Sequence, residues 1–126
     1  MQLNHVGLNI QSEEEIVNFY QNILGFHFEY QFDMPAELGN NIFGVNKQLK
    51  VLLYKKENIL LELFVHSVNP GKSFSHIGFE VKDRESIATK CEENNYQVIR
   101  IKRIEKSDIL FVKDKAGNYF ELKDGE

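Results

Sequence analysis

The sequence contains an internal repeat, and a repeat restricts the folds open to a chain more than any other feature. Residues 5–10 read His-Val-Gly-Leu-Asn-Ile, and residues 76–81 read His-Ile-Gly-Phe-Glu-Val, so the residue types match at every position. A helix-period run and alternating strand patterns follow each copy, and each half closes on an acid between apolar neighbours, Glu62 and Glu121. The pattern predicts a duplicated βαβββ module.

The chain length of 126 residues suits one domain made of both modules. We expect a single domain over residues 1–126, with module 1 at residues 1–65, a linker at residues 66–73 and module 2 at residues 74–126. Two such modules predict an α+β fold, with eight strands in a mixed sheet and a helix outside each half.

Local signals place the first elements of module 1. Residues 3–10 alternate as a strand. Ser12 is the expected N-cap of a helix over residues 12–24, and Glu15 completes a capping box with it. Gly25 stands where a C-cap glycine is wanted.

Three further strands complete the prediction for module 1. Alternation over residues 26–32 predicts a strand with one aromatic side, formed by Phe26, Phe28, Tyr30 and Phe32. Residues 33–46, which include one proline and two glycines, read as a loop with room for one short helical turn. Apolar strands follow at residues 50–54 and 59–65, joined by a polar turn.

Module 2 is predicted to repeat this plan. The expected elements are a strand at residues 74–81, a helix over about residues 84–94, and strands near residues 96–104, 109–113 and 119–123.

Composition excludes several classes of partner. A net charge of −4 provides no basic surface for nucleic acid. Because Cys91 is the single cysteine, an intramolecular disulfide is excluded. We expect Cys91 to pack on the inner face of the second helix. No secretory signal is visible, and no apolar run approaches the roughly 20 residues that cross a bilayer. We therefore expect a cytoplasmic protein with no membrane partner.

Four ionisable residues stand in apolar segments at equivalent places of the two modules: His5, Glu62, His76 and Glu121. Taken singly, each fits a hydrogen-bonded structural role. A carboxylate between leucines is nevertheless costly unless it is paired or bound to a cation. Strand alternation places all four on the concave side, and two imidazoles with two carboxylates suit zinc, nickel, cobalt or manganese. We therefore predict a divalent metal site.

The sequence resembles the vicinal oxygen chelate superfamily, which includes glyoxalase I, bleomycin-resistance proteins, methylmalonyl-CoA epimerase, fosfomycin-resistance enzymes and extradiol dioxygenases. The resemblance covers essentially the whole chain. It rests on His-Val-Gly and His-Ile-Gly-Phe opening the two modules, on Leu-Gly-Phe at residues 24–26, and on KDKAGNYFEL at residues 113–122. It implies a half-barrel cleft between two βαβββ modules and does not select one activity, because the family includes enzymes and binding proteins.

Within this family the His, Glu, His, Glu set most resembles bacterial glyoxalase I, a metal-dependent lyase that works through an enediolate. The resemblance implies metal binding by the four residues, with Glu62 or Glu121 moving the substrate proton. Asn9 stands where that enzyme has a glutathione-binding arginine, which counts against glutathione as the thiol. The implied substrate pocket includes Asn9, Phe43, Phe64 and His66.

Two alternatives remain open at this point. One is an epimerase of the methylmalonyl-CoA type, which acts on an acyl thioester by the same enolate chemistry. The other is a non-catalytic protein of the bleomycin-resistance type, which binds a planar molecule between residues such as Phe28, Phe43 and Phe64. A small-molecule ligand is common to all three, and the family implies a homodimer, in which modules pair within one chain or across two.

Overall fold

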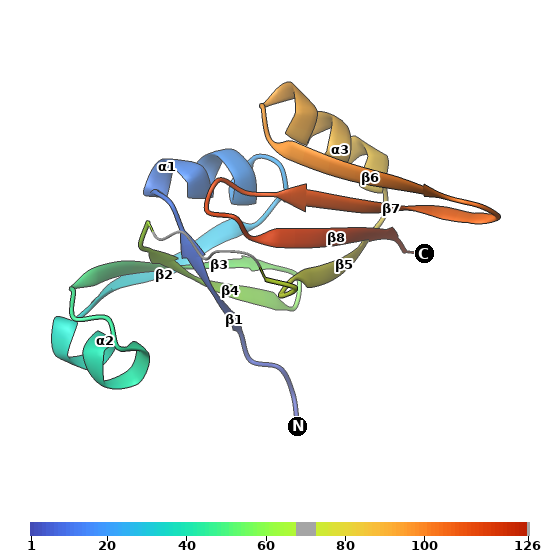
Figure 1. The fold of residues 1–126 in the computed structure, drawn as a ribbon. Helices are drawn as coiled ribbons and strands as arrows, with labels where there is room; N and C mark the ends of the chain where they lie inside the picture. Colours follow the sequence, from blue (N-terminus) through green and yellow to red (C-terminus); the bar gives the residue numbers. More distant parts are fainter. Residues whose placement is uncertain (68–72, 126) are drawn as a thin grey trace. The chain divides into compact units, whose positions relative to one another are not determined.

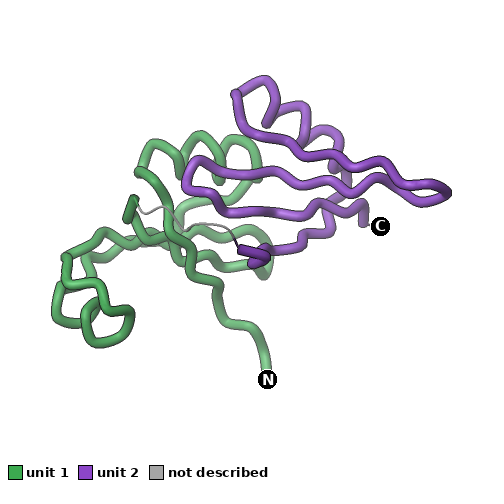
Figure 2. Tube along the Cα trace, in the orientation of Figure 1, with its two compact units in different colours: residues 1–68 green, residues 69–126 purple. Residues whose placement is uncertain are grey.

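The computed structural model describes residues 1–67 and 73–125 (Figure 1). The chain divides into two compact units, residues 1–68 and 69–126 (Figure 2). Most of the predicted linker, residues 68–72, lies outside the described residues. The assignment of both units to one domain stays a prediction.

Each unit contains a four-stranded mixed sheet, and the two sheets have the same strand order. The first sheet runs β1-β4-β3-β2 and the second runs β5-β8-β7-β6. In each sheet the first and last strands of the unit, β1 and β4 or β5 and β8, pair in parallel, and the other pairs are antiparallel. The predicted α+β class and duplicated strand plan are confirmed, with the eight strands divided between two sheets.

The bounds of the elements are as follows. Unit 1 contains β1 (Val6–Ile10), α1 (Glu13–Glu15), the π-helix η1 (Ile16–Gln21), β2 (His27–Met34), α2 (Ala36–Phe43), β3 (Leu49–Lys56) and β4 (Ile59–Val65). Unit 2 contains β5 (Ile77–Val81), α3 (Arg84–Glu93), β6 (Gln97–Arg103), β7 (Lys106–Lys113) and β8 (Tyr119–Asp124). Within the described ranges, no helix is long and apolar enough to cross a membrane.

The first helix begins where the sequence predicts, but it is not a regular α-helix. The Ser12 hydroxyl oxygen accepts a hydrogen bond from the Glu15 backbone N–H at 3.2 Å, as an N-cap should. After one α-turn the chain widens into η1, in which hydrogen bonds span five residues. Phe19 and Tyr20, although adjacent in sequence, are both fully buried in this wider turn.

A β-bulge in β2 changes which aromatic side chains share a face. The register of the β2–β3 pair shifts between Phe28 and Tyr30, so Glu29 is an extra residue. Phe28 therefore lies with Tyr54, at 5.8 Å between ring centroids, whereas Tyr30 lies with Phe32 at 6.5 Å. The prediction that these aromatic residues form one side of the strand is wrong, because an inserted residue inverts the alternation after it.

Residues 33–46 contain an eight-residue helix, α2, where the sequence was expected to form a loop with at most one short helical turn. The helix ends at Gly44, whose φ of +72° is the left-handed conformation that glycine adopts readily. Gly39 is buried in its middle, and a Cβ there would lie 2.9 Å from the Val45 carbonyl oxygen. The helix was not predicted because glycine is a poor helix former. In this helix Gly39 is needed for close packing.

In unit 2, α3 covers one face of the sheet (Figure 1). The Asp83 side chain caps it by accepting a hydrogen bond from the Ser86 N–H at 3.1 Å. The helix buries Ala88 and Cys91. The buried strand residues of this unit are Leu110, Val112, Phe120 and Leu122.

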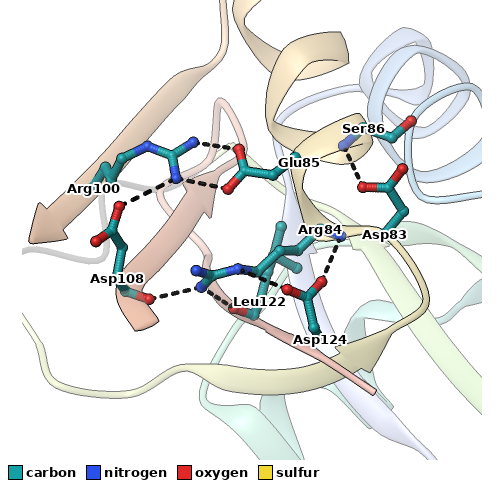
Figure 3. A network of polar contacts seen from close by, with 8 residues as sticks. All are labelled: Asp83, Arg84, Glu85, Ser86, Arg100, Asp108, Leu122 and Asp124. Atoms are coloured by element: carbon teal, nitrogen blue, oxygen red, sulfur yellow. Dashed lines mark hydrogen bonds and ion pairs between the residues drawn. The ribbon is translucent and has the colours of Figure 1, made fainter. Parts of the chain in front are cut away.

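Arg84, at the start of α3, is the buried centre of a polar network (Figure 3). Its guanidinium donates hydrogen bonds to the Asp108 carbonyl at 2.7 Å and the Leu122 carbonyl at 3.3 Å. It also forms an ion pair with Asp124 at 3.4 Å. One side chain thereby joins α3 to β7 and β8.

We expect Arg84→Ala to lower the free energy of unfolding by about 2–3 kcal/mol, because two strand carbonyls lose a charged donor in a buried place. Urea unfolding followed by circular dichroism measures this. The matched control is Arg100→Ala, which removes the nearby ion pair with Glu85 at 2.6 Å. That pair is solvent-accessible, so the control should lose much less stability; equal losses would contradict the role given to Arg84.

Cys91 should be unreactive in the folded protein. Its side chain is fully buried, and burial raises the pKa of its thiol to about 12, so almost no thiolate exists at pH 8. We expect no reaction with Ellman's reagent on the minute scale at pH 8, and one thiol per chain after unfolding in guanidinium chloride. Rapid reaction of the native protein would show that α3 opens easily.

Candidate functional site

Parallel strand pairing places a histidine and a glutamate on the same face of each sheet. Gly7 pairs with Glu62 across β1 and β4, and Gly78 pairs with Glu121 across β5 and β8. Each histidine stands two residues before the glycine, one residue before its strand begins. Because side chains alternate along an extended chain, histidine and glutamate point to the same side.

The two pairs have nearly the same geometry. The His5 Nε2 atom lies 3.5 Å from Glu62 Oε2, and the His76 Nε2 atom lies 3.7 Å from Glu121 Oε1. The imidazoles are 43% and 41% exposed, and the carboxylates are 21% and 23% exposed. The repeat in the sequence thus becomes a repeated, solvent-accessible His–Glu pair.

Hydrogen bonds at the far side of each ring indicate its tautomer. His5 Nδ1 lies 2.8 Å from the Asn4 side-chain oxygen, and His76 Nδ1 lies 2.8 Å from the Phe74 carbonyl oxygen. Amide oxygens only accept, so both Nδ1 atoms carry the hydrogen. In the neutral ring, Nε2 then directs a lone pair toward a carboxylate, an arrangement that favours a cation between the two groups.

The separations suit a shared cation better than a direct hydrogen bond. Two donors about 2.0–2.2 Å from a tetrahedral ion are roughly 3.3–3.6 Å apart. The observed 3.5 Å and 3.7 Å are close to this range and long for a hydrogen bond. Each pair supplies two side chains that could bind a metal ion. Nowhere in residues 1–67 and 73–125 do three or more His, Cys, Asp or Glu form a group that could hold a metal.

Unit 1 also has a pocket of about 610 Å³ beside its His–Glu pair. Its polar lining residues lie on or next to β1 and β4: His5, Asn9, Glu62 and His66. The apolar lining comes from all four strands and the α2 region: Leu8, Met34, Phe43, Val45, Leu49 and Phe64. A pocket of this size and character is typical of small-molecule sites.

The ring of Phe64 lies against Gly7. A Cβ on Gly7 would lie 3.3 Å from the Phe64 ring, whereas a Cβ on Gly78 would meet nothing within 4 Å. The strand position that corresponds to Phe64 in unit 2 is Lys123. The two units therefore share the His–Glu pair but differ at the strand position two residues after the glutamate.

The structure places the predicted site residues as follows. His5 and Glu62 form one pair, His76 and Glu121 form another, and Asn9, Phe43, Phe64 and His66 all line the pocket. Their roles in binding and catalysis stay predictions. Phe28 does not line this pocket, because the bulge turns it toward Tyr54. Sequence reasoning missed Met34, Val45 and Leu49, although the alternation of Leu49 with Val51 and Leu53 was visible.

Unit 2 has aromatic and basic neighbours around its own pair that the sequence did not single out. The Phe111 ring lies 5.4 Å from the His76 ring and 6.4 Å from the Tyr119 ring. The Lys113 ammonium lies 4.8 Å from the Tyr119 ring centroid, at cation–π distance. Strand pairing of Lys113 with Tyr119 explains this contact.

Comparison with known proteins identifies the family of this chain. The model of the Glyoxalase/Bleomycin resistance protein/Dioxygenase superfamily matches residues 2–122, and the chain belongs to this family. No curated protein matches the sequence.

Several solved structures have the same fold. A glyoxalase family protein from Enterococcus faecalis has a TM-score of 0.70 at 20% identity, with 96% of this chain and 95% of that chain covered. The fosfomycin resistance protein FosX from Listeria monocytogenes, as a mutant complexed with Mn(II) and 1S,2S-dihydroxypropylphosphonic acid, has a TM-score of 0.74 at 15% identity, covering 99% and 90%. A glyoxalase family protein from Bacillus cereus has a TM-score of 0.71 at 11% identity, covering 97% and 92%.

The two glycines provide a matched test of the pocket wall. Gly7→Ala should displace the Phe64 ring by a few tenths of an ångström, whereas Gly78→Ala meets open space. We expect the first variant, and not the second, to shift the aromatic proton resonances of Phe64 in NMR spectra. Unchanged Phe64 resonances in Gly7→Ala would contradict the described contact.

Proposed function

We propose that this protein is a divalent-metal-dependent lyase or isomerase of the glyoxalase I type, which acts on a small molecule with two adjacent oxygens. The observation that carries the proposal is the repeated pair, His5–Glu62 and His76–Glu121, in which each Nε2 atom lies 3.5 or 3.7 Å from a carboxylate oxygen. Family membership and the manganese-bound FosX neighbour support a divalent cation in general.

A bound divalent cation would act as a Lewis acid on the substrate oxygens and stabilise the negative charge of an enediolate. The chain's own residues would do the rest. Glu62 lines the pocket and is partly exposed, so its carboxylate can take a proton from the carbon next to the substrate carbonyl and return it. Glu121 is the equivalent carboxylate of unit 2, and Asn4 and the Phe74 carbonyl hold the two imidazoles in orientation.

A second candidate is a binding protein that sequesters an apolar small molecule. The apolar side of the unit 1 pocket supports it, because such a pocket binds a ligand without any chemistry. The His–Glu pairs favour the enzyme, because sequestration by itself does not require an imidazole that faces a carboxylate. An acyl-CoA substrate has no comparable support, since no lysine or arginine lines this pocket.

Metal content tests the proposal first. Protein purified without chelator or nickel affinity resin should contain about one divalent ion per chain by elemental analysis, as expected if both pairs bind the same ion. Glu62→Ala and Glu121→Ala should each lose it, while Glu29→Ala, an exposed carboxylate on β2, should keep it. Two ions per chain would show that each pair binds its own ion. Protein that stays empty after incubation with zinc, nickel, cobalt or manganese would favour the binding protein.

Glu62→Gln should abolish proton transfer and leave the fold intact. We expect the exchange of the α-hydrogen of a hydroxyketone or hemithioacetal for solvent deuterium, followed by NMR, to fall by roughly 10²–10⁴-fold, the usual contribution of a general base. The thermal unfolding midpoint should change little, because the side chain keeps its size. A Glu62→Gln protein that exchanges deuterium at the wild-type rate would remove Glu62 as the base.

A further inference from the structure

The unit 1 pocket carries information about the chemical class of its ligand. Its polar lining residues lie on or next to β1 and β4, and its apolar lining comes from β1, β2, β3, β4 and the α2 region. A ligand that fills it should therefore be amphipathic. The His5–Glu62 pair is the place where its oxygens would lie.

The apolar side offers ring faces and not only aliphatic surface. Phe43 and Phe64 meet edge to face, with centroids 5.5 Å apart and planes at 70°. Met34 and Leu49 continue this side and belong to a buried apolar cluster that Phe64 also contacts. Phe43 is 57% exposed although it is packed against Phe64, so a flat apolar group in the pocket would cover it.

The charge of the pocket also restricts which ligands can bind. Among its lining residues, Glu62 alone carries a formal charge when the histidines are neutral, and no lysine or arginine is present. An anionic group entering this space would lose water and face a carboxylate, with no basic side chain to pair with it. A phosphonate such as the one bound in the Listeria FosX complex, or the carboxylates of a peptide thiol, would find no lysine or arginine here.

We infer that the part of the substrate held by unit 1 is uncharged and carries a flat, aromatic-sized apolar group, with two adjacent oxygens directed at His5 and Glu62. The substrate class is then a neutral aryl or similarly flat hydroxyketone or ketoaldehyde derivative. This inference rests on the proposed function for the role of the oxygens, whereas the charge and shape preference belongs to the pocket itself.

The test compares two probes that differ by one charge. The probes are 2-hydroxyacetophenone and its 4-carboxy derivative, and their binding is measured by saturation-transfer NMR and calorimetry. The protein is first treated with a chelator, so that a carboxylate cannot gain affinity by binding a metal. We expect the neutral probe to bind at least about tenfold more tightly, the factor that corresponds to 1.4 kcal/mol.

A charge introduced into the pocket provides the matched variant. Asn9→Arg adds a cation to the polar side and should narrow or reverse the preference for the neutral probe. Asn18→Arg adds the same charge to the exposed surface of η1, away from the pocket lining, and should leave the preference unchanged. Thermal unfolding of both variants confirms folding, and the wild-type comparison decides the question if Asn9→Arg does not fold.

The outcomes separate this inference from the proposed function. Equal or tighter binding of the carboxylated probe, or no binding of either probe at millimolar concentration, would overturn the inference even if the protein contains metal. A clear preference for the neutral probe in a protein that binds no metal would support the inference and reject the metal-dependent enzyme.

Discussion

The parallel pairing of a His-x-Gly strand with a glutamate-bearing strand is the constraint on which the rest of the structure depends. It fixes Gly7 opposite Glu62 and Gly78 opposite Glu121, and a shift of one residue would send the carboxylate into the apolar face. The buried strand residues on the other face, such as Leu61 and Leu63, oppose such a shift. Hydrophobic burial on one face of each sheet therefore sets the position of the polar chemistry on the other.

Much of this fold could be predicted because its determinants are local. The Ser12 cap, the strand over residues 59–65 and the repeated strand plan follow from period and capping chemistry, and the structure has each of them. The bulge at Glu29 and the helix α2 could not be predicted in this way. A bulge depends on the partner strand. The helix α2 contains Gly39, which packs closely against its surroundings, whereas local propensity counts glycine against a helix.

The candidate site likewise has one part that could be predicted from the sequence and one part that could not. Each His–Glu pair was predictable because the repeat and the strand period suffice to place two side chains together. The pocket in unit 1 depends on α2, which unit 2 replaces with the tight turn between β6 and β7. The two modules thus share the His–Glu pair, whereas the pocket residues from the α2 region belong to unit 1. Residues such as Met34 become pocket residues through tertiary packing alone.

The two imidazoles also differ in what holds them. The ring of His5 donates to a side chain, Asn4, whereas the ring of His76 donates to the main chain at Phe74. A single substitution at residue 4 can change the basicity and orientation of the first imidazole, but no side-chain replacement removes the carbonyl that orients the second. The first His–Glu pair is therefore adjustable by mutation, whereas the second is set by the path of the backbone.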